Sequence, residues 1–175
     1  LAWKVFKSGF VPTYIIGIWR GGAPLAIAVH ELLYFLGVHA KHTPIKTSSY
    51  DGLTRRDEIT IDGLAPLCEM ITKNDSLLVV DDVHDTGHSI EHLLTNIRTM
   101  LLSSKPEIRV ATAYFKPNRN ETGKEPDYFL HKNNDWLVFP HELEGLSLDE
   151  LKIQKPALSK ILPEIQEHFN KNTFS

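Results

Sequence analysis

The feature that most restricts the fold is the run from Leu77 to Ser89, where an apolar segment leads into acidic and then small polar residues. Residues 77–80 are all apolar. They are too few for an independent helix and are typical of a strand buried on both faces. Apolar residues recur at helical spacing from Ile90 to Leu101, which predicts a helix directly afterwards. We therefore expect a strand, an acidic tip, a tight loop and a helix.

The loop of this unit combines two kinds of ligand-binding group. Open parallel sheets bind ligands beyond the carboxyl ends of their strands. A turn containing Thr86, Gly87 and Ser89 that enters a helix offers backbone N–H groups, hydroxyls and the positive end of the helix dipole, which suit a phosphate. The adjacent Asp81 and Asp82 suit sugar hydroxyls or a hard cation such as Mg²⁺. A phosphorylated ribose fits both, whereas the alternative of an ordinary helix N-cap explains only part of the pattern.

A second unit of the same kind lies near the start of the chain. Residues 14–18 form another buried-strand candidate, and apolar residues at helical spacing follow from Leu25 to Leu33. Between them stand Arg20, Gly21 and Gly22. Two glycines let the backbone approach an anion closely while the guanidinium contacts it. A plain turn between strand and helix is the alternative.

The stretch from Leu77 to Ser89 resembles the phosphoribosyl-pyrophosphate (PRPP) signature of type I phosphoribosyltransferases. That signature is an apolar run, two acids, two variable residues and Asp-Thr-Gly-X-Ser/Thr. Neither a Walker loop nor a Gly-X-Gly-X-X-Gly fingerprint occurs. The resemblance implies an α/β fold, with a mostly parallel twisted sheet flanked by helices, a small hood segment and a C-terminal helix. It also implies a single domain over residues 1–175, with a core at about 14–116, a hood at about 117–145 and a helical tail at 146–175.

In this family the Arg/Lys-Gly-Gly loop contacts pyrophosphate and often holds a cis peptide, so the resemblance assigns Arg20, Gly21 and Gly22 to pyrophosphate. Purine enzymes of the family carry Ser-Tyr at the start of a flexible loop that closes over the site. Ser49 and Tyr50 match it here, in a polar stretch whose composition alone predicts a solvated hairpin or mobile loop. The neighbouring Arg55 and Arg56 are further candidates for the pyrophosphate.

The purine enzymes also supply candidates for base binding. Residues 108–114 read as a third strand that ends before Lys116 and Pro117. Alone, such a lysine is more often solvated, but in purine enzymes it hydrogen-bonds the exocyclic oxygen of a 6-oxopurine. Residues 135–142 resemble the hood of bacterial xanthine-guanine enzymes, so Trp136 is expected to stack on the base and the Leu137 backbone to read its edge. The alternative for Trp136 is a core position in a short apolar strand.

The implied reaction transfers the 5-phosphoribosyl group from PRPP to hypoxanthine, guanine or xanthine, giving a purine nucleoside monophosphate and pyrophosphate in purine salvage. Asp85 is the expected acid/base at purine N7. Mg²⁺ is the expected cofactor, with Glu142 near a second metal position. The residues assigned to ribose, metal and 5′-phosphate are Asp81, Asp82, Asp85, Thr86, Gly87, His88 and Ser89.

Two alternatives remain open, a non-catalytic PRPP- or nucleotide-sensing regulator of the same fold and a transferase for another base. A net charge of −3 argues against a nucleic-acid-binding regulator, and a lysine donor at position 116 argues against adenine. The family favours homodimers or homotetramers.

The remaining expectations concern the whole chain. No apolar run approaches a membrane span, and the single cysteine, Cys68, fits a reducing cytoplasm and a core or half-buried thiol. The chain starts at Leu1 rather than Met, which leaves open a missing N-terminal piece. Other segments are expected as follows: a helix end at 1–6, a short strand at 39–47, a long polar connection or lid at 117–134, and a helical tail at 143–175 with one apolar face.

Overall fold

The structure is a computed structural model that describes residues 1–48, 60–143 and 145–172. The chain divides into two compact units, Leu1–Asp135 and Trp136–Ser175, which we call the N-terminal and C-terminal units. A single domain over the whole chain stays a prediction.

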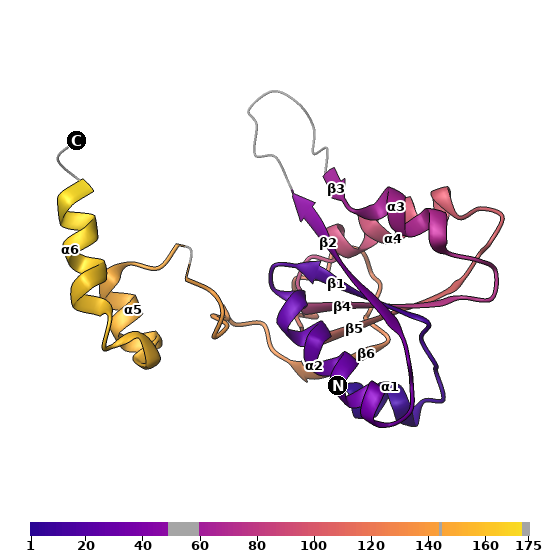
Figure 1. Cartoon of the computed structure of the whole chain (residues 1–175), viewed down its shortest axis with the longest axis horizontal. Helices are drawn as coiled ribbons and strands as arrows, with labels where there is room; N and C mark the ends of the chain where they lie inside the picture. Colours follow the sequence, from indigo (N-terminus) through magenta and orange to yellow (C-terminus); the bar gives the residue numbers. More distant parts are fainter. Residues whose placement is uncertain (49–59, 144, 173–175) are drawn as a thin grey trace. The chain divides into compact units, whose positions relative to one another are not determined.

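The N-terminal unit is built on one six-stranded sheet in the order β3-β2-β1-β4-β5-β6 (Figure 1). Among the described strands, β2 and β3 pair antiparallel and the other four pairs are parallel. The α/β prediction, with a mostly parallel sheet flanked by helices, is therefore confirmed. The elements, in chain order, are α1 (Ala2–Lys7), β1 (Tyr14–Trp19), α2 (Gly22–Phe35), β2 (Lys41–Ser48), β3 (Thr60–Asp62), α3 (Leu64–Met70), β4 (Ser76–His84), α4 (His88–Met100), β5 (Glu107–Phe115) and β6 (Tyr128–Lys132).

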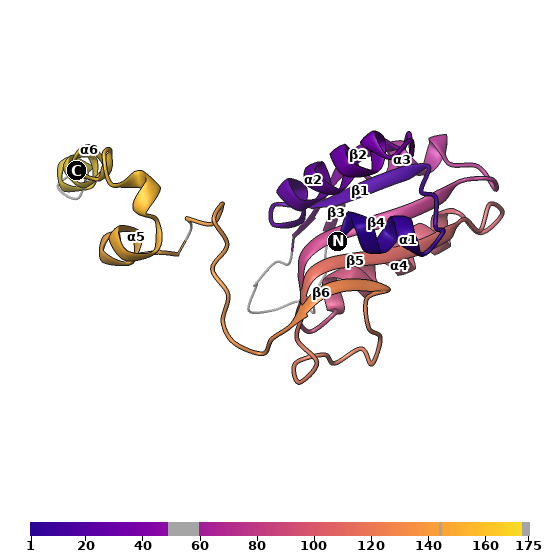
Figure 2. The same ribbon diagram turned by 90° about the horizontal axis from the view of Figure 1, so that it is seen from below.

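Successive side chains of the central strands pack alternately into two separate hydrophobic cores. Leu77 and Val79 of β4 pack in one core with residues of α3 and α4, whereas Leu78 and Val80 pack in the other with residues of α1 and α2. Because neighbouring residues of a strand point to opposite faces, a strand covered on both sides must be apolar throughout. All four of these residues are fully buried. Figure 2 shows the sheet with α2 and α4 on opposite faces.

The strand order reverses between β1 and β4, because β2 and β3 extend the sheet in one direction and β5 and β6 in the other. Such a switch point opens a crevice at the carboxyl ends of the two central strands, where ligands of open α/β sheets bind. The parallel register pairs Tyr14 with Leu77 and Gly17 with Val80. Therefore the loop after β1 and the loop after β4 leave the sheet side by side.

Several local predictions are confirmed. Helix α1 ends at Lys7 and is followed by Gly9 at φ 77°. Cys68 is buried in a core, and burial raises the pKa of its thiol.

Two expectations for the second half of the chain are wrong, and the alternative of a short apolar strand around Trp136 is not observed either. The segment 117–134 is not a connection throughout, because it contains the edge strand β6, whose first residue Tyr128 pairs with Ala111. Residues 135–142 form no strand. The tail is not one helix but α5 (Leu148–Gln154), a short 3₁₀ turn η1 (Pro156–Leu158) and α6 (Leu162–Asn172).

Local chemistry explains where the tail is divided. Ser147 and Glu150 form a reciprocal capping box that starts α5. Pro156 has no backbone N–H and cannot continue the helix, so the chain turns before α6 begins. The apolar residues from Leu158 to Phe169 therefore belong to more than one element.

Candidate active site

The loop after β1 lies directly against the end of β4, and two glycines make this approach possible. A Cβ atom on Gly21 would stand 1.9 Å from Asp82 Oδ2, and one on Gly22 would stand 2.4 Å from the Val80 carbonyl oxygen. No real Cβ atom tolerates such distances, so neither position has room for a side chain. The peptide bond between Trp19 and Arg20 is cis, in the loop where the resemblance led us to expect one. The structure thus brings the three predicted pyrophosphate residues beside the paired acids.

Asp81 and Asp82 belong to strand β4 itself, whereas the sequence led us to expect them just after the strand. The Asp81 carboxylate accepts the Asp82 N–H at 3.0 Å, and the Asp82 carboxylate accepts the Val83 N–H at 2.7 Å. Burial, and then the neighbouring charge of Asp82, raise the pKa of Asp81 well above its usual value. A bound cation relieves both effects, so this pair fits a metal ion.

The paired carboxylates of Asp81 and Asp82 are of the kind that bind Mg²⁺. Throughout 1–48, 60–143 and 145–172, no three His, Cys, Asp or Glu side chains gather into a group that could hold a metal ion. Mg²⁺ usually binds through one or two carboxylates and completes its coordination with water and substrate phosphates. Asp81 and Asp82 are the residues that would hold it.

The loop from Asp85 to Ser89 leads into the N-terminus of α4. Gly87 has φ 88°, a conformation that glycine adopts without strain, and a Cβ there would stand 2.6 Å from Thr122 Oγ1 and 2.9 Å from His84 Nε2. Helix α4 begins with His88, whose N–H donates to Thr86 Oγ1 at 3.5 Å, and the N-cap residue Gly87 has no side chain to cap the helix. The first N–H groups of a helix have no partner within it, which makes this end suited to an anion.

Asp85 lies between two cations. Lys116 Nζ is 3.1 Å from Asp85 Oδ2, and Arg119 Nε is 2.7 Å from Asp85 Oδ1. Lys116 follows β5 and is only 3% exposed, so the alternative of a solvated lysine is wrong. The structure therefore joins the predicted acid/base to the predicted base-binding lysine.

The segment 117–127 packs along the loop formed by residues 85–89. The sequence did not reveal this contact. The Glu121 N–H donates to the Thr86 carbonyl oxygen at 3.0 Å, and the Glu121 carboxylate pairs with His88 Nε2 at 2.7 Å. Lys124 pairs with Glu91 in the first turn of α4 at 2.6 Å. Arg119 and Glu121 were not identified from the sequence. The only available signal was their place in the polar segment just after Lys116 and Pro117.

His84, the second of the two variable residues between the paired acids and Asp85, is buried beneath the loop at 3% exposure. Its ring packs against Phe115 edge to face, with ring centroids 5.5 Å apart. Burial lowers the pKa of this imidazole, although hydrogen bonding and nearby carboxylates oppose the shift. His84 therefore supports the loop in its neutral form.

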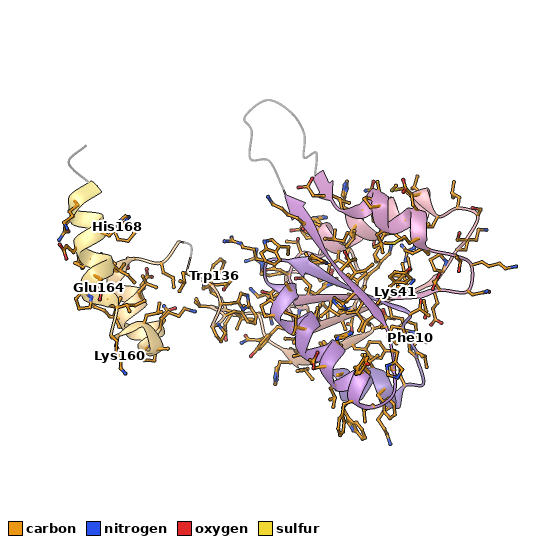
Figure 3. The ribbon with its side chains drawn as sticks, in the orientation of Figure 1. Phe10, Lys41, Trp136, Lys160, Glu164 and His168 are labelled. Carbon is orange, nitrogen blue, oxygen red and sulfur yellow. The ribbon has the colours of Figure 1, made fainter. Side chains whose placement is uncertain are left out.

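The other predicted site residues fall outside the described part of the N-terminal unit. Ser49, Tyr50, Arg55 and Arg56 lie outside the described residues. Trp136, Leu137 and Glu142 belong to the C-terminal unit. Trp136 is 82% exposed (Figure 3). The Glu142 carboxylate accepts the Phe139 N–H at 2.9 Å within a local turn.

A sheet with this strand order, with an Arg-Gly-Gly loop facing an Asp-Asp and Asp-Thr-Gly-X-Ser loop across its switch point, defines a phosphoribosyltransferase. The family model described as "Phosphoribosyl transferase domain" matches residues 1–148, and the chain belongs to this family.

Individual relatives agree with this assignment. A hypoxanthine-guanine phosphoribosyltransferase of Lactococcus lactis is 24% identical over 157 residues, covering 86% of this chain and 76% of the relative. A purine phosphoribosyltransferase of Pyrococcus horikoshii has a TM-score of 0.62 at 28% identity, covering 84% of this chain and 87% of its own. A xanthine-guanine-hypoxanthine phosphoribosyltransferase of Helicobacter pylori has a TM-score of 0.64 at 23% identity, covering 87% of this chain and 89% of its own.

In the described part of the chain, no helix is both long and apolar enough to cross a membrane.

Proposed function

We propose that this protein transfers the phosphoribosyl group of PRPP to N9 of a 6-oxopurine. The single observation that carries the choice of base is the pairing of Asp85 Oδ2 with Lys116 Nζ at 3.1 Å. The pair presents one acceptor, the carboxylate, beside one donor, the ammonium, at the carboxyl end of the sheet.

This pair is complementary to one edge of a 6-oxopurine. When N7 carries a proton, that edge offers an N7–H donor next to the O6 acceptor, which match the carboxylate and the ammonium. Adenine instead presents its amino group at this position, and two donors would then face each other. Lys116 is buried, so the mismatch could not be relieved cheaply by water.

The remaining groups suit the other parts of PRPP. The N-terminus of α4, with Thr86 and Ser89, is the proposed site of the 5′-phosphate. Arg20 and the backbone of the glycine pair are proposed to bind the pyrophosphate, which gains negative charge as it leaves. Asp81 and Asp82 would hold Mg²⁺ and face the ribose. When bound, the metal supplies positive charge that stabilises the leaving group.

The reaction balances with these residues. The bond between ribose C1′ and the pyrophosphate oxygen breaks, and its electron pair leaves with the pyrophosphate. The N9 lone pair forms the new bond to C1′, and the N7 proton passes to the Asp85 carboxylate. The positive charge that develops on the ribose lies near the carboxylates of Asp81 and Asp82, which favour it.

The names of the relatives support the same substrate class, because the Lactococcus and Helicobacter proteins are described as transferases for hypoxanthine, guanine or xanthine. A role in purine salvage, a cytoplasmic location and a homodimeric or homotetrameric state are part of the proposal. Analytical ultracentrifugation of the purified protein would decide between monomer, dimer and tetramer.

The test is pyrophosphate release from PRPP and Mg²⁺ with hypoxanthine, guanine, xanthine or adenine supplied singly. We expect release with one or more 6-oxopurines and little with adenine. Release with adenine alone would indicate a transferase for another base. Binding of PRPP without release for any base would favour the regulator.

The matched variant is Lys116→Met, which removes the ammonium and keeps an unbranched side chain. We expect the kcat/KM preference for 6-oxopurine over adenine to fall by about 10- to 100-fold, which corresponds to one hydrogen bond to a charged group. Lys124→Met is the control, because Lys124 pairs with Glu91 on α4 rather than with Asp85. An unchanged base profile in Lys116→Met would refute the assignment of this lysine.

A further inference from the structure

Asp85 has a second cationic partner besides Lys116, and this partner comes from the turn that follows β5. Arg119 Nε lies 2.7 Å from Asp85 Oδ1, while Lys116 Nζ lies 3.1 Å from Asp85 Oδ2. Each carboxylate oxygen therefore has its own cation. Lys116 also donates a hydrogen bond to Oδ2, whereas the contact of Arg119 with Oδ1 is an ion pair.

The turn that carries Arg119 is held in place by its backbone. The Lys116 N–H donates to the His84 carbonyl oxygen at 2.9 Å, and the Arg119 N–H donates to the Lys116 carbonyl oxygen at 3.1 Å. The Asn118 N–H donates to Asn134 Oδ1, just beyond β6, at 3.0 Å. These bonds connect the turn to β4 and to the segment after β6, so the sheet determines the backbone position from which the Arg119 side chain extends.

We infer that Arg119 is a positioning residue that orients the Asp85 carboxylate for proton transfer, an inference that rests on the proposed function. Lys116 faces both Asp85 and the proposed O6 of the base, and its contact with Asp85 is the longer of the two. When a purine binds and the ammonium turns toward O6, Arg119 keeps Oδ1 paired. Oδ2 then remains aimed at N7–H.

The position of Arg119 argues against direct contact with the base. Its side chain is 52% exposed, whereas that of Lys116 is 4% exposed. It reaches Asp85 through Oδ1, whereas Lys116 pairs with Oδ2. Its effect on the reaction therefore passes through Asp85.

The test is a double-mutant cycle on kcat with PRPP and the preferred 6-oxopurine. Arg119→Gln is expected to lower kcat by about tenfold or more and to change the KM for PRPP by less than about twofold. In the Asp85→Asn background the same substitution should lower kcat by less than about twofold, because no carboxylate remains to be oriented. Arg119→Lys, which keeps the charge, should recover part of the lost kcat.

Lys124→Gln is the matched control, since Lys124 lies in the same segment and forms an ion pair of similar exposure with Glu91. Its kcat should stay within about twofold of the wild type. If the wild type transfers the phosphoribosyl group and Arg119→Gln keeps its kcat, the inference is overturned while the proposed function stands. An equal loss of kcat in both backgrounds also overturns it. If the wild type transfers to no base, both proposals fail together.

Discussion

The contact between Gly21 and Asp82 gives the sharpest test of how the two loops are placed. Replacement of Gly21 by alanine puts a methyl group 1.9 Å from Oδ2, 2.4 Å from Cγ and 2.7 Å from Oδ1 of Asp82. The backbone of Gly21 itself does not resist the change, because φ −60° and ψ −41° suit any residue. The whole cost therefore arises from the carboxylate of Asp82.

This carboxylate must move if Gly21 becomes alanine. Its Oδ1 accepts the Val83 N–H at 2.7 Å, and displacement gives up this bond. Overpacking of this kind costs about 1–3 kcal/mol. For a chain of this length that corresponds to a Tm lowered by about 2–12 °C.

The same structure predicts a specific rescue. Asp82→Ala removes all three atoms that the new methyl group would meet, so Gly21→Ala should cost less than about 0.5 kcal/mol in that background. Gly22→Ala is the control, because its methyl group would meet the Val80 carbonyl oxygen at 2.4 Å and the Asp81 Cα at 2.8 Å. Those are backbone atoms, and Asp82→Ala leaves them in place.

The assay is thermal and urea unfolding of the four proteins of each cycle without ligand. Destabilisation by Gly21→Ala that is equal in both backgrounds would refute the placement of the loop after β1. Rescue of Gly22→Ala by Asp82→Ala would refute it as well.

Two further predictions concern titrating groups near the site. The raised pKa of Asp81 means that its contribution to stability is present below its unfolded value near 3.8 and is lost as pH rises through the folded value. Asp82→Asn should therefore reduce, without abolishing, the decrease in the free energy of unfolding measured in urea from about pH 4 to pH 7. An unchanged decrease would contradict this prediction. The lowered pKa of His84 has the opposite sign, so its contribution is present above 6.5 and is lost as pH falls through the folded value. His84→Gln should reduce the loss of urea stability between about pH 7 and pH 5, and a loss as large as that of the wild type would exclude this role.

The sequence by itself determined the local units of this protein. The apolar run 77–80, the acids after it and the helical spacing from Ile90 all lie within one short stretch. Periodicity and turn chemistry act over such distances, so the strand, loop and helix of the signature follow from neighbouring residues. The glycine pair after β1 could be recognised for the same reason.

The tertiary structure alone decided which of these pieces meet. The edge strand β6 could not be recognised within its polar segment. Its five residues carry little periodicity, and its backbone is paired on one side only. The tail contained enough apolar residues for one helix, but a capping box and Pro156 divided it.

The same distinction holds for the site. Asp85 and Arg119 are far apart in the chain, and nothing near either residue indicates that they pair. The parallel register of β4 with β5 brings the ends of these strands together, and that register is fixed by burial of both faces of the sheet. Packing over the whole N-terminal unit therefore determined which cations face Asp85, whereas the sequence had indicated only that Asp85 and Lys116 were candidates.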